Sequence, residues 1–350
     1  MSQIDFGRSV RVVRVARDRI TGRFDTRSLI VSGVLAVAIV CVLVVSLGTG
    51  DVSVSPWRVV RVVFGGGDAP ERLVVLQWRM PRALMAVVAG AALAVSGAIF
   101  QAMTRNPLGS PDVIGFTSGA YAGAVLSILV LRGSGLSTPV GALLGGLATA
   151  MAVYLLAYRR GVEGFRLIIV GIGVSTILAA ITTWLMMRAQ LELAIQAAVW
   201  GTGTIAGTTW WQLGYVSIAT SVLIPLALAA APTLRALGMG EDAARALGTR
   251  VRTAMLALTV LGVAMSAAVV AFCGMIMFIS LAAPQLARRA AQSGELPLIS
   301  SALMGALLLS GSDWIAQHGL GEEDLPVGVV TVSVGGAYLI WLLIREARRR

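Results

Sequence analysis

Ten long apolar stretches, separated by short polar turns, dominate the pattern of residues along the chain. Each is close to the roughly 20 apolar residues that an α-helix needs to cross the hydrocarbon core of a membrane. The pattern therefore predicts an all-α integral membrane protein with about ten transmembrane helices. The predicted spans cover 29–49, 83–103, 113–132, 138–157, 167–187, 209–231, 251–271, 274–291, 297–317 and 326–344.

Two of these spans form one almost continuous apolar run over 251–291, which is interrupted only at Phe272-Cys273-Gly274. A single helix of that length would be about twice as long as the membrane is thick. The sequence therefore predicts a tight reversal near Gly274. The second span of the pair also contains Pro284, which removes a backbone hydrogen bond. This proline indicates a broken helix that lines a protein-filled or water-filled space.

The arginines indicate how the spans are oriented. An even number of spans places both termini on one side, and cytoplasmic termini would put 21 of the 28 arginines inside and 7 outside. Because cytoplasmic loops carry an excess of basic residues, both termini are predicted to be cytoplasmic. The chain then divides into a basic N-terminal segment, 1–28, a membrane domain, 29–345, and a basic C-terminal tail, 346–350. We expect segment 1–28 to lie on anionic lipid headgroups.

Composition excludes several functional classes. The chain is 57% apolar and only 13% charged, which is far from the composition of a soluble domain. Its net charge of +11 does not indicate nucleic-acid binding, because apolar spans separate the arginines. With no lysine, the chain lacks the phosphate-binding loop G-x-x-x-x-G-K-[ST]. Its single histidine, His318, excludes an H-E-x-x-H metal site and leaves no residue set for an intramembrane enzyme.

Asp313 is the only acidic residue well inside a predicted span. Carriers that couple transport to protons or sodium use carboxylates within the membrane, and one carboxylate gives little support to that class. An ion-coupled secondary transporter is therefore kept as an alternative only. We expect Asp313 to pair with the backbone or with an arginine near the membrane interface.

The loop 237–249 is the most informative polar segment. Gly240 and Gly248 flank a stretch that is expected to form a helix of about two turns. Glu241 and Asp242 would stabilise the N-terminus of that helix through its dipole. Such a helix would be either an interfacial linker or a docking helix for a partner protein.

Several short motifs follow one another along the chain. They are Arg79-Met80-Pro81-Arg82, Gln101 with Asn106-Pro107-Leu108, the Gly240–Gly248 loop, Pro284 and Leu325-Pro326-Val327-Gly328. Each motif is weak alone, but their order and spacing resemble those of the FecCD family, the permease subunits of type II ATP-binding-cassette importers. The resemblance covers the chain from about residue 30 to its end.

The resemblance implies the type II importer permease fold, a ten-helix subunit in the cytoplasmic membrane of a bacterium. It implies a second permease, identical or paralogous, an extracytoplasmic substrate-binding protein, and separate ATPase subunits that bind ATP and Mg²⁺. This chain would then be non-catalytic and would hold no cofactor of its own. The implied cargo is a ferric siderophore, with haem or cobalamin as alternatives.

The resemblance also implies roles for individual residues, although interfacial anchoring is an alternative for the arginines. Docking of the binding protein is expected at Arg79 and Arg82, with Arg58 and Arg61 adding to the electrostatic field. Coupling to the ATPase is expected at Gly240, Glu241, Asp242, Ala244, Arg245, Leu247 and Gly248. The pathway and its gate are expected at Gln101, Asn106, Pro107, Gly164, Phe165, Pro284 and Gln285.

The chain departs from the family pattern near its eighth span. It has Cys273-Gly274-Met275-Ile276-Met277-Phe278 where the family commonly has Gly-Pro-Ile-Gly-Phe. It has Gln285 after Pro284, where a histidine is common, and Gln317 four residues after Asp313, where an arginine is often found.

Overall fold

A computed structural model describes residues 10–15, 20–50, 52–112, 115–131, 136–157, 164–293, 297–319 and 325–347. The strands are β1 (Val10–Val15) and β2 (Ile20–Asp25). The helices are α1 (Thr26–Gly48), α2 (Pro56–Val63), α3 (Ala69–Arg72), a π-helix (Leu73–Arg79), α4 (Met80–Thr104), α5 (Phe116–Leu131), α6 (Ser137–Ala157), α7 (Gly164–Arg188), α8 (Leu191–Thr202), α9 (Trp210–Ala229), α10 (Ala231–Gly238), α11 (Glu241–Ala246), α12 (Val251–Cys273), α13 (Ile279–Ala291), α14 (Leu298–His318) and α15 (Val327–Ala347).

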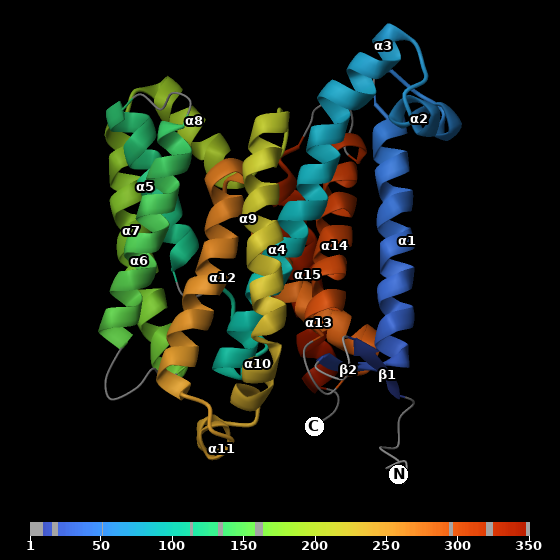
Figure 1. The fold of residues 1–350 in the computed structure, drawn as a ribbon. Coiled ribbons are helices and arrows are strands. Elements are labelled where there is room, and N and C mark those ends of the chain that lie inside the picture. Colours follow the sequence, from blue (N-terminus) through green and yellow to red (C-terminus); the bar gives the residue numbers. More distant parts are fainter. Residues whose placement is uncertain are drawn as a thin grey trace.

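The long helices stand side by side, with short elements at both ends of the bundle (Figure 1). Helices α2, α3 and α8 lie at one end, which we call the α2 end. Helices α10 and α11, the two strands and the last turn of α15 lie at the other, which we call the α11 end.

The predicted spans all correspond to helices, so the protein is a multi-pass membrane protein with an all-α membrane domain. Seven helical segments of the described chain are long and apolar enough to cross a membrane, and the apolar helices of α5 and α15 are shorter. The helix of the eighth predicted span, α13, has only 13 residues and is too short to cross a membrane by itself. The seven segments are Thr26–Gly48, Ala69–Thr104, Ser137–Ala157, Ile168–Arg188, Trp210–Ala229, Val251–Cys273 and Leu298–His318.

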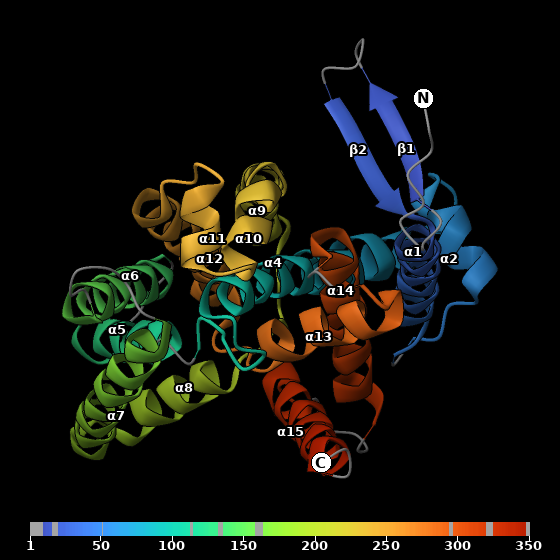
Figure 2. The ribbon, with the colours of Figure 1, turned by 90° about the horizontal axis from the view of Figure 1, so that it is seen from below.

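Several elements at the ends of the bundle were not predicted, including α2 and α10. Helix α4 continues through the π-helix into α3, well beyond the predicted start of its span at residue 83. The short helix α8 precedes α9 at the α2 end. Within segment 1–28, β1 and β2 pair antiparallel as a hairpin, which projects from the foot of α1 away from the other helices (Figure 2). Residues 1–9 and 16–19 of this segment, and 348–350 of the tail, lie outside the described residues.

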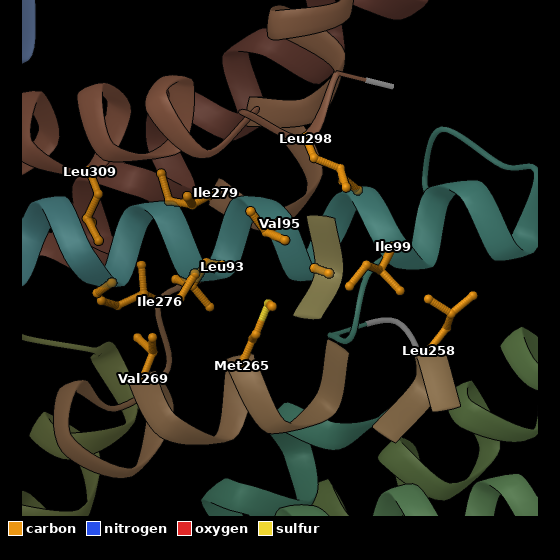
Figure 3. Packing of buried hydrophobic residues seen from close by; sticks show 14 of the residues in the cluster. Leu93, Val95, Ile99, Leu258, Met265, Val269, Ile276, Ile279, Leu298 and Leu309 are labelled. Atoms are coloured by element: carbon orange, nitrogen blue, oxygen red, sulfur yellow. The ribbon is translucent and has the colours of Figure 1, made fainter. Parts of the chain in front are cut away.

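Helix α4 lies at the centre of the core. In its most apolar window 78% of residues are buried, more than in the other candidate spans. Its residues Leu93, Val95 and Ile99 pack between Met265 of α12 and Leu309 of α14 (Figure 3). Such close packing of membrane helices requires small residues at the crossing points.

Glycines occupy those crossing points. A β-carbon added to Gly90 of α4 would collide with the backbone of Gly305 in α14, and one added to Gly305 would collide with that of Gly90. Helices α5 and α6 cross in the same way at Gly123 and Gly141. The glycines at these crossings therefore serve helix packing.

The chain reverses where the sequence predicted, but the eighth helix breaks at a different place. Helix α12 ends at Cys273, and Gly274 has a φ of 68°, a conformation that glycine adopts without strain. Residues 274–278 are not helical, and α13 begins only at Ile279. The break therefore lies before the helix, whereas Pro284 sits inside a continuous α13. The expectation of a break at the proline was wrong, because the break follows from the positive φ of Gly274 and Phe278.

Candidate functional site

A buried ion pair joins α4 to α14 at the α2 end. The Arg82 Nε and Nη2 atoms donate to the Asp313 carboxylate at 3.1 and 3.0 Å, and the Gln317 amide donates to its other oxygen at 2.7 Å. The Asp313 side chain is 2% exposed and that of Arg82 is 15% exposed. Of the two partners expected for Asp313, the backbone or an arginine, the structure shows the arginine. A paired carboxylate with all these donors is a structural cross-link between the two helices.

The other predicted docking arginines differ in their surroundings. Arg79 donates to the backbone carbonyls of Leu47 and Val52, so it holds the connection between α1 and α2. Arg58, on α2, forms an exposed ion pair with Glu71 at 2.9 Å. Arg61 is exposed on the same helix. Three of the four arginines, Arg58, Arg79 and Arg82, therefore have partners within the chain, and Arg58 and Arg61 are exposed at the α2 end. The docking role stays a prediction for all four.

A second polar cluster lies in the core between α4 and α13. The Gln285 amide donates to the Gln101 side-chain oxygen at 2.6 Å, and the Gln101 amide donates to the Leu281 carbonyl at 2.9 Å. Arg288 donates to Gln285 at 3.0 Å. Both glutamines are 3% exposed. The structure thus brings together two of the predicted pathway residues as a buried hydrogen-bonded pair.

Asp112 extends this polar region, and the sequence analysis missed it. It lies in the turn between α4 and α5, where its carboxylate accepts hydrogen bonds from Thr117 of α5 and from Ser280, in the first turn of α13, at 2.9 Å. Burial raises the pKa of the Asp112 carboxyl, and the two hydrogen bonds oppose that rise. The only sequence signal was an acidic residue directly before an apolar span, which is common at helix starts.

Asn106 and Pro107 lie in the turn after α4, and among the described residues neither forms a hydrogen bond with this cluster. Asn106 accepts a hydrogen bond from the Leu108 amide at 2.9 Å and so shapes the turn that ends α4, next to an exposed Pro107. Gly164 and Phe165 begin α7, and the surroundings of both lie outside the described part of the chain. Their assignment to a gate stays a prediction.

The helix predicted in the loop 237–249 is present as α11, over Glu241–Ala246. Gly240 and Gly248 bound it with φ values of 111° and 82°. Arg245 forms ion pairs with Glu241 and Asp242, both at 2.7 Å. The prediction of this helix is confirmed, although it is shorter than two full turns.

The α11 segment is exposed at one side and anchored at the other. Leu247 is 65% exposed, whereas Ala244 is fully buried. A β-carbon on Gly240 would lie 3.5 Å from the guanidinium of Arg105, the residue that ends α4. The segment therefore contacts the end of the central helix and presents charged and apolar side chains outward.

Comparison with known proteins places this arrangement in context. A family model described as the FecCD transport family matches residues 29–345. The ferric enterobactin transport system permease protein FepG of Escherichia coli (strain K12) is 44% identical, over 89% of this chain and 97% of its own length. The siderophore transport system permease protein YfhA of Bacillus subtilis (strain 168) is 37% identical, over 87% and 91%.

A solved structure has the same fold. It is that of a metal-chelate type ABC transporter in an inward-facing conformation, with a TM-score of 0.80 and 27% sequence identity. The match covers 91% of this chain and 99% of that chain.

Proposed function

The chain belongs to the FecCD transport family, and we propose that it is the permease subunit of an ATP-binding-cassette importer that carries a ferric siderophore into the cell. The observation that carries the proposal is the 44% identity to a ferric enterobactin permease over almost the full length of both chains. Iron would cross inside its chelator and remain cargo. The absence of a lysine, and hence of a Walker A loop, supports an external source of ATP energy.

The two ends of the bundle would serve different partners. The α11 segment is exposed, charged and packed against the end of α4, which suits a surface that transmits movement from an ATPase subunit. The exposed Arg58 and Arg61 at the α2 end suit an acidic binding protein. ATP and Mg²⁺ would bind to the ATPase, and a second permease, identical or paralogous, would complete the pathway.

This proposal requires the α11 end to face the cytoplasm, together with both termini. The 21 to 7 division of arginines supports that orientation. Single cysteines introduced at Gly65 and Gly248, after replacement of Cys41 and Cys273, test it directly. A membrane-impermeant thiol reagent added to intact spheroplasts should label position 65 and not position 248. Labelling of position 248 alone would show that the protein has the opposite orientation.

Uptake of radioiron tests the function. The chain, reconstituted in vesicles with its ATPase and binding protein, should accumulate iron supplied as ferric enterobactin only when ATP is present, and an uncoupler should have no effect. Uptake that survives without ATP and collapses with the uncoupler would favour an ion-coupled carrier. Haem and cobalamin are the competing substrates, and preferential uptake of either would replace the siderophore assignment.

A further inference from the structure

An apolar groove of about 210 Å³ separates the α2 ends of α1 and α4. Val44 and Leu47 of α1 form one wall, Ala83 and Leu84 of α4 form the other, and Phe64, directly after α2, also lines it. The remaining lining residues are also apolar. A water molecule in such a groove would find no hydrogen-bonding partners, so hydrocarbon suits it better than water does.

The groove exists because α1 is held by a different neighbour. The Ser32 and Ser300 hydroxyls lie 2.9 Å apart near the α11 end, and Trp314 donates to Thr49 at 3.1 Å near the α2 end. Both contacts tie α1 to α14. The side of α1 that faces α4 is therefore left incompletely packed, and α2 spans the gap.

Helix α2 fixes the depth of the groove in the membrane. Val59 and Val62 are buried on one face, whereas Arg58 and Arg61 are exposed on the other. Trp57 is also 76% exposed, and tryptophan favours the interface between lipid and water. The apolar face of α2 packs on the protein, and its exposed face carries the arginines and the tryptophan that are typical of the membrane interface. The groove between the adjoining ends of α1 and α4 then lies at the depth of the acyl chains.

The Arg61 guanidinium on α2 offers a positive charge to a phosphate group at the membrane interface. Arg58 is already paired with Glu71, but the Arg61 guanidinium has no ion pair or hydrogen bond to any residue that the structure describes. The Arg61 side-chain stem packs over Gly66, close to the groove-lining Phe64. Its charge is complementary to a phospholipid headgroup at the same end of the molecule.

We propose that this groove is a specific phospholipid site, in which one acyl chain fills the space between α1 and α4 and the phosphate pairs with Arg61. The bound chain supplies the packing that α1 lacks against α4. The site does not depend on the cargo. It shares Arg61 with the proposed docking surface, so a bound phosphate would leave the docking charge mainly to Arg58.

Native mass spectrometry of the purified chain in detergent tests this site. The wild-type protein should retain one phospholipid. Val44→Phe occupies part of the groove and, by displacing roughly two methylene groups of the acyl chain at about fourfold each, should lower that occupancy by a factor of about ten or more. Val37→Phe is the matched control, because it adds the same side chain to a position of α1 that is 64% exposed and does not line the groove. Equal phospholipid occupancy in the two variants would overturn the proposal.

A second measurement needs no variant in the groove. A phospholipid with a photoreactive group in its acyl chain should cross-link the wild-type protein mainly within 40–47 and 80–84. Arg61→Gln should weaken retention of phospholipid but not of diacylglycerol, which has the same chains without the phosphate. Cross-links spread evenly along α1, or formation of a protein adduct at the groove when the partner subunits are present, would contradict the assignment.

Discussion

The backbone carbonyl oxygen of Ser280 occupies the place where a β-carbon on Gly97 would be. Pro284 has no N–H group, so in α13 the Ser280 carbonyl lacks its usual partner four residues later. The α-carbon of Gly97 takes that place, as carbon–hydrogen groups do at close helix crossings. The proline of α13 and the glycine of α4 are therefore complementary parts of one contact.

Gly97→Ala should destabilise the protein by roughly 1–3 kcal/mol, because the added methyl group forces α4 and α13 apart. Thermal unfolding in detergent would measure the loss. Gly311→Ala is the control: that glycine is also inside a helix but has no atom within 4 Å of the added carbon. The control should be neutral or slightly stabilising, because alanine favours helix by up to about 1 kcal/mol. Equal unfolding temperatures for the two variants would show that the contact between Gly97 and Ser280 does not stabilise the protein.

Local patterns predicted the parts of the fold that depend on neighbouring residues. The apolar stretches gave the spans, Gly274 marked the reversal, and Gly240 with Gly248 marked a short helix, since each depends on chain length or on a positive φ. The Gln101–Gln285 contact joins α4 to α13, far apart in the chain, and no local pattern encodes it. The break before α13 escaped prediction because Pro284 was the more visible signal.

The buried ion pair of Arg82 and Asp313 should be strongly coupled. Asp313→Asn leaves the Arg82 charge without its counter-ion in a nearly dry site. Arg82→Gln leaves the Asp313 carboxylate without its counter-ion in the same site, so each change should destabilise the protein. A double-mutant cycle should give an interaction energy of roughly 1–3 kcal/mol. The same cycle on the exposed pair of Arg58 and Glu71 should give less than about 1 kcal/mol. Equal coupling in both cycles would show that burial does not strengthen the Arg82 pair.

The glutamine pair in the core should tolerate removal of both members better than removal of one. Gln285→Leu leaves Gln101 without its donor and Arg288 without its acceptor, at a cost of roughly 1–3 kcal/mol. Adding Gln101→Leu should recover part of that loss. Gln285→His, which introduces the residue common in the family, keeps a nitrogen donor and should unfold closer to the wild type than Gln285→Leu does. A further loss in the double variant would show that Gln101 is satisfied without its partner.

The exposed arginines of α2 should govern binding-protein association. Arg58→Glu combined with Arg61→Glu should slow association with the proposed binding protein and flatten its dependence on salt concentration, because electrostatic steering acts mainly on the on-rate. Surface plasmon resonance at several ionic strengths measures both. Arg105→Glu, at the α11 end, should change neither. Reversal of Arg79 or Arg82 is less informative, since both arginines hold structure within the chain.

Exchange of charges on α11 should separate the permease from its ATPase without unfolding the segment. Glu241→Arg with Arg245→Glu keeps opposite charges four residues apart, so the cost to this exposed helix is a few tenths of a kcal/mol. The pattern presented to the partner is nevertheless reversed, and co-purification with a tagged ATPase should fall. The matched control exchanges Arg58 and Glu71, an exposed pair at the opposite end. If both variants retained the ATPase equally, α11 would be an interfacial linker.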